Sequence, residues 1–146
     1  MGPIRTPTGR IAHLAALAAC VAGAGALSAA AAAPACAPGD EACPVVLKMA
    51  PGATSIVASG SVSGERPDYY FKFAARAGQT LTLHIVGGNI KSGPGVPIAF
   101  PNGGGGAVDV DAPFALPATG AYVIDLHANT MSEGPFGRFT LTLTIK

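Results

Sequence analysis

Asp109 and Asp111 are two carboxylic acids only two positions apart in this 146-residue chain, and such a pair could do acid–base chemistry. In a β-strand they would share one face, because side chains alternate and Val110 points the other way. A retaining glycosidase needs two carboxyl groups about 5 Å apart in a cleft, one of them with a raised pKa. A calcium site needs more oxygen ligands than this pair supplies. The pair follows the glycine run 103–106, and we interpret it as a solvated strand face.

Nucleophilic catalysis has equally few candidates. His84 and His127 fall on expected outer strand faces, and Asp125 shares the face of His127. A Ser-His-Asp triad of the hydrolase kind needs a Gly-x-Ser-x-Gly elbow at a strand-to-helix turn. The stretch 60–64 looks similar, but its central residue is a valine and it lies in or beside a strand. We therefore expect no catalytic site, no cofactor and no metal site, and interpret the chain as a non-enzyme.

Two of the three cysteines lie close together in the sequence, and the third is distant from them. Cys36 and Cys43 are separated by six residues, and Cys20 lies far upstream. In an oxidising compartment the default for Cys36 and Cys43 is a disulfide, which would stabilise the fold by about 2–3 kcal/mol. A metal site is a weak alternative, because no further Cys or His lies at ligand spacing.

The first 35 residues are typical of an export signal. Arg5 and Arg10 form a charged start, and the run Ile11–Ala33 is apolar and rich in small residues. Ala-x-Ala cleavage sites occur repeatedly between Ala29 and Ala35. We expect cleavage at residue 35 or slightly before it, and a periplasmic or secreted protein. An uncleaved signal anchor is the alternative, but its residues are small for a membrane span.

Cys20 leaves a second alternative open. The stretch Leu17-Ala18-Ala19-Cys20 is similar to a lipobox, in which the cysteine is acylated and becomes the new N-terminus. The chain would then be an outer-membrane lipoprotein, held by its acyl chains. Otherwise Cys20 is a small apolar residue of a cleaved signal, and the mature chain has no membrane partner.

The amino-acid composition indicates the fold class and excludes one class of partner. The chain has no Trp, 20 Gly and 13 Pro, and 12% of its residues are charged, which favours an all-β fold with tight turns. Removing Arg5 and Arg10 turns the formal net charge of +1 into −1. Without a basic cluster we expect no nucleic-acid partner. The length suits one domain, which we place at 45–146 behind a disulfide-pinned leader at 36–44.

Alternating apolar residues predict an antiparallel β-sandwich of jelly-roll or immunoglobulin-like type with about eight or nine strands. Pro97 interrupts one short strand, which we therefore place at a sheet edge. The expected strands are 45–49, 55–63, 68–74, 80–85, 96–100, 107–110, 113–116, 121–128 and 138–145. The residues expected to point inward are Ile56, Val62, Tyr69, Phe71, Phe73, Leu81, Leu83, Ile85, Tyr122, Ile124, Leu126, Phe139, Leu141, Leu143 and Ile145.

Several turn and core motifs resemble those of a known family. They are Ala50-Pro51-Gly52-Ala53-Thr54-Ser55, Gly60-Ser61-Val62-Ser63-Gly64, Asp68-Tyr69-Tyr70-Phe71 with Ala75-Arg76-Ala77-Gly78-Gln79-Thr80-Leu81, and Leu116-Pro117-Ala118-Thr119-Gly120-Ala121-Tyr122. From Val45 to Lys146 the chain resembles the bacterial pre-peptidase C-terminal domain superfamily, most closely the periplasmic inhibitors of g-type lysozyme. The resemblance implies a β-sandwich and a protein partner.

In the inhibitor branch, lysozyme binding is associated with a Ser-Gly-x-Tyr-like turn and basic residues downstream. The resemblance points to Thr119, Gly120 and Tyr122 for the turn, and to His127 and Asn129 in the downstream loop, which has no arginine. We expect these five residues at one end of the sandwich. The alternative for Gly120 and Tyr122 is a turn glycine and a buried, corner-like tyrosine.

The sequence therefore predicts an exported, non-catalytic binding protein with a protein partner, g-type lysozyme being the first to test. One alternative is an accessory domain that binds polysaccharide or assists secretion; its stacking candidates are Tyr70, Phe100, Phe114 and Phe136. Another is an unrecognised hydrolase that uses Asp109 and Asp111.

Overall fold

The computed structural model describes residues 36–90, 93–132 and 134–146. The expected export signal and Cys20 lie outside these residues. The described part forms nine strands and no helix, and so contains no helix able to cross a membrane. The strands are β1 (Val45–Leu47), β2 (Ser55–Val62), β3 (Asp68–Ala75), β4 (Thr80–Gly87), β5 (Val96–Ala99), β6 (Gly105–Val108), β7 (Phe114–Ala115), β8 (Gly120–His127) and β9 (Gly137–Ile145).

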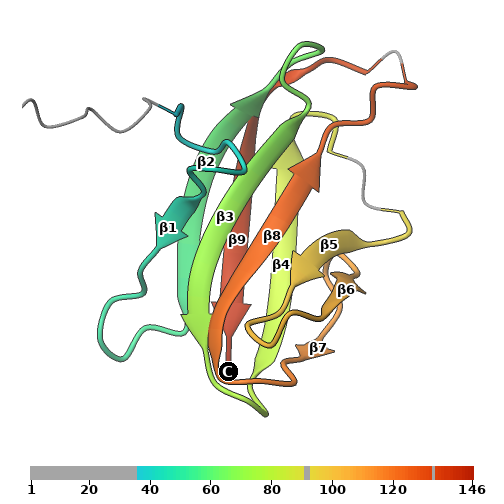
Figure 1. Cartoon of the computed structure of the whole chain (residues 1–146). Helices are drawn as coiled ribbons and strands as arrows, with labels where there is room; N and C mark the ends of the chain where they lie inside the picture. Colours follow the sequence, from blue (N-terminus) through green and yellow to red (C-terminus); the bar gives the residue numbers. More distant parts are fainter. Residues whose placement is uncertain (1–35, 91–92, 133) are drawn as a thin grey trace, which may run out of the picture. The chain divides into compact units, whose positions relative to one another are not determined.

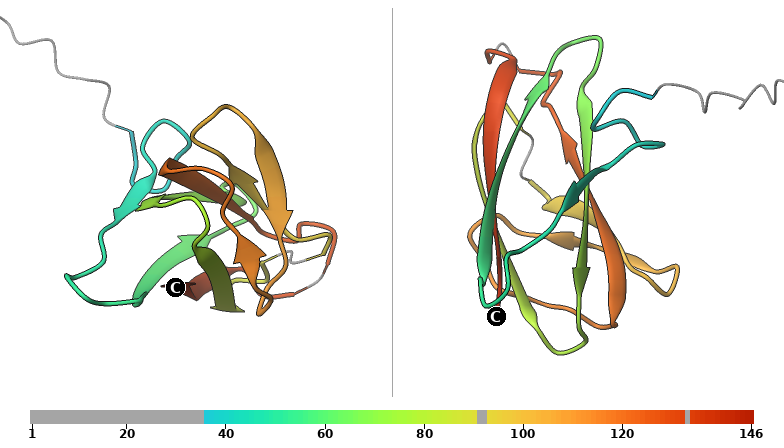
Figure 2. Two further views of the ribbon diagram at one scale, coloured as in Figure 1. Left: turned by 90° about the horizontal axis from the view of Figure 1, so that it is seen from below. Right: turned by 90° about the vertical axis from the view of Figure 1, so that its left-hand side faces the viewer.

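The strands form two sheets that lie face to face (Figure 1). One has the order β1-β3-β8-β5-β6 and the other β2-β9-β4-β7. All pairs are antiparallel except β1 with β3, which run parallel. The two layers are seen edge-on in the right-hand view of Figure 2. The predicted all-β sandwich is confirmed.

The core forms where the alternating residues of the two sheets meet. On β9, for example, every second residue from Phe139 to Ile145 is buried, and the threonines between them face outward. Of the fifteen residues expected to point inward, twelve are buried, and Ile56, Tyr69 and Ile85 are half-buried against them. Each fully buried Leu or Phe contributes roughly 1.5–3 kcal/mol. The short strands and their flanks add core residues that the prediction missed: Leu47, Val96, Ile98, Val108 and Leu116.

The expectation that Pro97 marks a sheet edge is wrong. Strand β5 lies between β8 and β6. The pairing of β5 with β8 covers only Ile98 and Ala99, so Pro97 lies just before the segment that forms this ladder. The missing N–H of proline is tolerated there, because no bond to β8 is required from it.

The leader at 36–44 is closed on itself by a disulfide and is attached to the sandwich by separate contacts. Cys36 and Cys43 are bonded, with Cα atoms 5.9 Å apart. The N–H of Tyr70 in β3 donates to the carbonyl of Gly39 at 2.8 Å. The guanidinium of Arg66 pairs with the Asp40 carboxylate at 2.5 Å. The leader thus continues the edge of the five-stranded sheet beyond the start of β1.

Candidate functional site

The turn before β8 is built around a buried tyrosine. Tyr122 is fully buried, and its ring stacks on Phe73 at a centroid distance of 5.5 Å. Its hydroxyl donates to the carbonyl of Ala118 at 2.5 Å and accepts the Ala118 N–H at 2.9 Å. These contacts match the corner-like alternative for Tyr122. The side chain has no surface to offer a partner.

The two residues before Tyr122 also have structural roles. Gly120 has φ +148°, and a Cβ at this position would lie 2.6 Å from Cβ of Pro101. No larger residue fits without displacing that proline. The exposed Thr119 accepts a hydrogen bond from the N–H of Ala77 at 3.0 Å through Oγ1. This turn therefore joins the β3–β4 turn to the start of β8.

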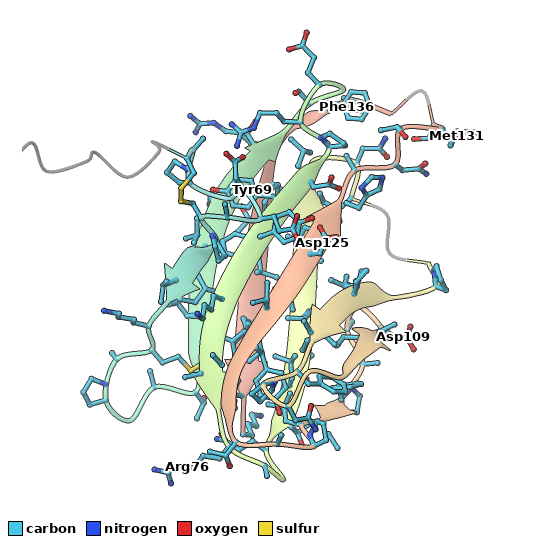
Figure 3. The ribbon with its side chains drawn as sticks, viewed as in Figure 1. Tyr69, Arg76, Asp109, Asp125, Met131 and Phe136 are labelled. Atoms are coloured by element: carbon cyan, nitrogen blue, oxygen red, sulfur yellow. A yellow bond between two sulfur atoms is a disulfide. The ribbon has the colours of Figure 1, made fainter. Side chains whose placement is uncertain are left out.

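His127 and Asn129 lie at the opposite end of the sandwich. Strand β8 separates them from Thr119, and eight strand residues span about 25 Å. Figure 3 shows the two ends: Arg76, next to the first turn, lies at one, while Met131 and Phe136 lie at the other. The expectation that the five candidate residues share one end is wrong, because the motif that suggested them continues through a whole strand.

The loop after β8 is held by a residue that the sequence analysis missed. Nδ2 of Asn89 donates to the carbonyl of Asn129 at 3.0 Å and to Oγ of Ser132 at 2.7 Å. The N–H of Asn129 donates in return to the carbonyl of Asn89 at 2.7 Å. Asn89 has φ 52°, a conformation that asparagine adopts more readily than most residues. An asparagine after Gly87-Gly88 was the available signal.

This loop presents apolar side chains to solvent. Met131 is 95% exposed, and its N–H is fixed by Oδ1 of Asn129 at 3.2 Å. Phe136 is 38% exposed at the same end (Figure 3). Because a bulky side chain is exposed on a backbone held by several hydrogen bonds, this end resembles a preorganised contact surface. We call Asn89, Asn129–Ser132 and Phe136 the Asn129 loop surface.

A polar cluster lies on the outer face of the five-stranded sheet. His127 pairs through Nδ1 with the carboxylate of Asp68, its cross-strand neighbour on β3. Asp125, two residues before His127, keeps one carboxylate oxygen buried and without a hydrogen-bond partner among the residues that the structure describes. Burial, and then the nearby Asp68 carboxylate, raise the pKa of Asp125 above its ordinary value. Burial and the Asp125 charge likewise raise the pKa of Tyr70.

The same face is hollow beside Asp125. Small side chains on β5, β6 and β8 leave a space of about 570 Å³ between Tyr70 and the β5–β6 hairpin. Its lining includes Tyr70, Asp125, Val123, Ala99 and Gly105. Tyr70 and Asp125 are cross-strand neighbours, which places a phenol and a carboxylate side by side on the wall. Such a surface can accept and donate hydrogen bonds to a polar ligand.

The two carboxylates first considered for catalysis are not a pair. Strand β6 ends at Val108, so Asp109 and Asp111 do not share a strand face. Asp111 lies in a turn with φ 63°, and its carboxylate contacts Nδ1 of His84 at 2.7 Å. Both partners of that contact are exposed. The expectation of a shared strand face is therefore wrong, and the contact of Asp111 with His84 is an open surface pair.

The stretch 60–64 is no nucleophile elbow. Gly60, Ser61 and Val62 belong to β2, and Val62 is buried in the core. Oγ of Ser63 accepts the N–H of Arg66 in the following turn at 3.1 Å. In the described residues, no group of three or more His, Cys, Asp or Glu side chains lies close enough together to hold a metal ion.

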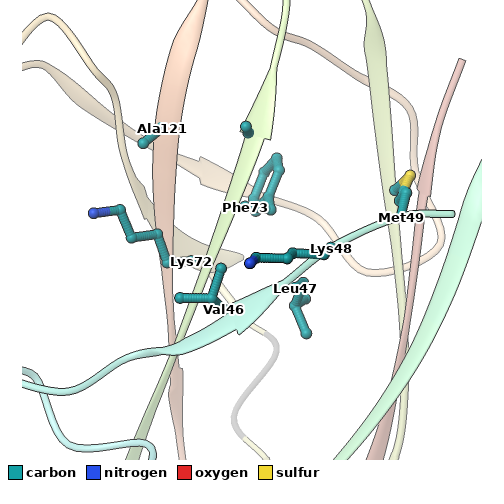
Figure 4. Close-up of a pocket in the computed structure, with 8 residues that line it drawn as sticks. Val46, Leu47, Lys48, Met49, Lys72, Phe73 and Ala121 are labelled. Carbon is teal, nitrogen blue, oxygen red and sulfur yellow. The ribbon is translucent and has the colours of Figure 1, made fainter. Parts of the chain in front are cut away.

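A second hollow, of about 680 Å³, opens where β1 ends and leaves the side of β3 (Figure 4). Its apolar lining comes from Val46, Leu47, Met49 and Phe73, and Lys48 and Lys72 lie at its rim. Sequence reasoning did not find it, because it depends on the parallel pairing of β1, which stops after three residues.

Comparison with solved structures places the fold among lysozyme inhibitors. The chain is similar to Aeromonas hydrophila PliG, a periplasmic inhibitor of g-type lysozyme, with 26% identity and a TM-score of 0.54, covering 70% of this chain and 95% of that one. It is also similar to PliG of Salmonella Typhimurium (19% identity) and to a mutant of PliG from Escherichia coli (18%). Each of these has a TM-score of 0.57 and covers 70% of this chain and 96% of the other. No protein-family model and no curated protein sequence matches the chain.

Proposed function

We propose that this chain is an exported, non-catalytic protein that binds and inhibits g-type lysozyme in the periplasm. The observation that carries the proposal is the likeness to Aeromonas hydrophila PliG, which extends over 95% of that inhibitor at 26% identity. The export signal expected at 1–35 and the Cys36–Cys43 disulfide fit an oxidising compartment. The wider resemblance to the pre-peptidase C-terminal domain superfamily belongs to the same proposal and rests on the turn motifs of the sequence.

The proposed contact is the Asn129 loop surface. Among the five candidate residues, Tyr122 is buried and cannot meet a partner directly, and Gly120 lies against Pro101 and has no side chain to offer. The loop that follows His127 instead exposes Met131 on a backbone fixed by Asn89 and Asn129. A fixed loop loses little conformational entropy when it binds, which favours specific association.

The absence of arginine from 127–132 shapes the expected interface. The loop therefore offers no guanidinium or lysine ammonium group to a partner. Affinity would come from the apolar side chains of Met131 and Phe136, with hydrogen bonds at the rim from Asn129 and its neighbours.

The proposal of a non-catalytic role has two supports. The similar solved structures are inhibitors of g-type lysozyme. The acidic residues suggested for hydrolysis have different surroundings: Asp111 contacts His84, whereas Asp109 lies beside Gly95.

A polysaccharide-binding role is the second candidate, and the hollow beside Asp125 favours it. Sugars bind to protein surfaces that combine an aromatic ring with carboxylate acceptors for hydroxyl groups. Tyr70 and Asp125 supply both groups in a space of about 570 Å³. Phe100 and Phe114, by contrast, pack on each other at 6.2 Å and offer less free ring surface.

The test is lysis of bacterial cells by g-type, c-type and i-type lysozymes in the presence of the purified protein. We expect inhibition of the g-type enzyme, weakened at least about tenfold, or about 1.4 kcal/mol, by Met131→Asp. Thr119→Ala is the matched control, because Thr119 is exposed at the far end of β8. Thr119→Ala should inhibit the g-type enzyme about as strongly as the original chain does.

The absence of g-type inhibition at concentrations well above micromolar would contradict the proposal, because even weak specific interfaces register there. Equal loss in Met131→Asp and Thr119→Ala, with both folded, would contradict the choice of surface. Glycan-array binding that is lost in Tyr70→Ala, without any lysozyme inhibition, would support the second candidate.

A further inference from the structure

Strand β2 is the long open edge of the described part of the fold. It ends the four-stranded sheet and pairs along its whole length with β9 alone. It has eight residues, whereas the other three edge strands, β1, β6 and β7, have three, four and two. In Figure 1 it forms one border of the rear sheet. A long edge of this kind is a template for pairing with a further strand.

The register shows which backbone groups are free. The N–H of Ile145 donates to the carbonyl of Thr54 at 2.8 Å, immediately before the pair Ser55–Thr144. Hydrogen-bonded pairs alternate along an antiparallel ladder, so the even-numbered residues of β2 face β9. The odd-numbered ones therefore direct their N–H and C=O groups to the open edge; they are Ser55, Val57, Ser59 and Ser61.

The chain beyond β2 agrees with this assignment. Ser63, the next odd-numbered residue, has its N–H turned away from β9 and bonded to the carbonyl of Arg66 at 3.0 Å. In the part of the chain that the structure describes, the corresponding groups of Ser55, Val57, Ser59 and Ser61 have no backbone partner. The edge of β2 thus presents a row of unpaired donors and acceptors.

The sequence of β2 lacks the usual means of protecting such an edge. Natural sheets protect edges with charged side chains, prolines, bulges or short strands. Ser55–Val62 contains no charged residue and no proline, and its pairing with β9 runs through eight consecutive residues without a bulge. Val57 is 63% exposed in the middle of the strand.

We propose that β2 pairs in antiparallel fashion with β2 of a second copy of this chain, which joins two four-stranded sheets into one of eight strands. The two-fold axis passes beside Ala58, which lies opposite Ala58 of the second copy. Ser55 then faces Ser61 of the second copy, and Val57 faces Ser59 of the second copy. This register overlaps the strands almost completely and sets every outward-facing donor against an acceptor.

A second copy fits this edge because the edge is self-complementary. A two-fold axis at Ala58 maps odd-numbered residues onto odd-numbered ones, so hydrogen-bonding positions meet and the inner and outer faces stay in phase. No like charges face each other, since the strand has none. Val57 is covered in the pair, and Ile56 and Ala58, half-buried in one copy, become more buried. The contact is small, so we expect a weak, concentration-dependent dimer.

The first test is sedimentation of the protein isolated from cells that express the full chain, from about 1 µM to 1 mM, a range that covers weak association. We expect the average mass to rise from one copy toward two. In Ala58→Lys two ammonium groups would face each other on the inner side of the joined sheet, so we expect a single copy throughout. A monomer at all concentrations for the original chain would overturn the proposal.

The second test fixes the register and does not need Ala58→Lys to fold. Cα atoms of a hydrogen-bonded antiparallel pair lie about 5.5 Å apart, within the range for a disulfide. Mixing Val57→Cys with Ser59→Cys should give an oxidised heterodimer. Thr142→Cys is the matched control, because Thr142 is the neighbour of Val57 on the central strand β9 and should not cross-link. Cross-linking by Thr142→Cys equal to that of the mixture would overturn the proposal. Both tests are independent of lysozyme inhibition.

Discussion

The hydroxyl of Tyr122 lies 2.5 Å from the carbonyl oxygen of Ala118, four residues earlier in the chain, and accepts the N–H of the same residue at 2.9 Å. One side chain thus satisfies both backbone groups of Ala118. The ring itself is fully buried between Phe73 and Phe100, with centroid distances of 5.5 and 6.0 Å. The turn before β8 is therefore anchored from inside the core.

Tyr122→Phe keeps the ring and removes the hydroxyl. We expect the free energy of unfolding to fall by about 1–3 kcal/mol, since two backbone groups lose their partner at a partly buried site. Chemical denaturation measures the change. Tyr70→Phe is the control, because the structure shows no hydrogen bond from the Tyr70 hydroxyl within the described residues. An equal loss in both variants would contradict the anchoring role of Tyr122.

Leu83 and Thr82 test which face of β4 points inward. Leu83 is fully buried, whereas Thr82 points outward beside Thr144 of β9. A charge at Leu83 would be buried without a partner, so Leu83→Asp should prevent folding. Thr82→Asp should fold with little loss of stability. Circular dichroism and solubility of the two proteins give the answer, and equal tolerance would show that the register of β4 is wrong.

Local alternation was enough to predict the strands and the inward side of the long ones. On β3, β4, β8 and β9 the apolar residues repeat every second position, and each face meets a different environment. The position of Pro97 could not be predicted, because sheet order depends on pairings between strands that are distant in sequence.

The candidate site was predicted less well, for a physical reason. Thr119 and Asn129 are ten positions apart in sequence, but a strand places its two ends about 25 Å apart. The hydrogen bonds of Asn89 to Asn129 and Ser132 join residues forty or more positions apart, so no local sequence pattern predicts them. The turn motifs therefore predicted the fold, whereas the Asn129 loop surface could be identified only from the hydrogen bonds in the structure.

The Cys36–Cys43 disulfide closes a short loop that carries two contacts to the sandwich, Gly39 with Tyr70 and Asp40 with Arg66. Replacing both cysteines by serine should lower the free energy of unfolding by about 2–3 kcal/mol, because the unfolded chain gains freedom. Mass spectrometry with alkylation, before and after reduction, checks the bond itself. Two free thiols at Cys36 and Cys43 in protein from an oxidising compartment would contradict it.

Export can be checked at the N-terminus, which lies outside the described residues. N-terminal sequencing of protein from the periplasm or medium should give a start between Ala30 and Cys36, as the Ala-x-Ala sites predict. Incorporation of a labelled fatty acid, lost in Cys20→Ser, would instead establish a lipoprotein. Intact Met1 on cytosolic protein would contradict both forms of export.

Asp125 should make the stability of the fold depend on pH. Its pKa is raised above the ordinary 3.8, first by burial and then by the Asp68 carboxylate. The folded state therefore holds this proton more tightly than the unfolded chain does. The stabilisation is complete below the ordinary value and is lost as pH rises through the folded-state value. Asp125→Asn removes this loss, so the variant should be more stable than the original chain at pH 7, with a smaller difference near pH 3.

The matched control for this prediction is Asp109→Asn, which removes the same charge from an exposed position. We expect its free energy of unfolding at pH 7 to stay close to that of the original chain, because the side chain is exposed. The gain in Asp125→Asn should be modest, because the Asp125 side chain is only half-buried and solvent screens its charge. Urea denaturation at several pH values between 3 and 8, where the carboxyl changes its charge, measures all three proteins. A variant Asp125→Asn that is less stable than the original chain at pH 7 would contradict the prediction. It would show that the ionised carboxylate has a favourable partner and that its burial does not destabilise the fold.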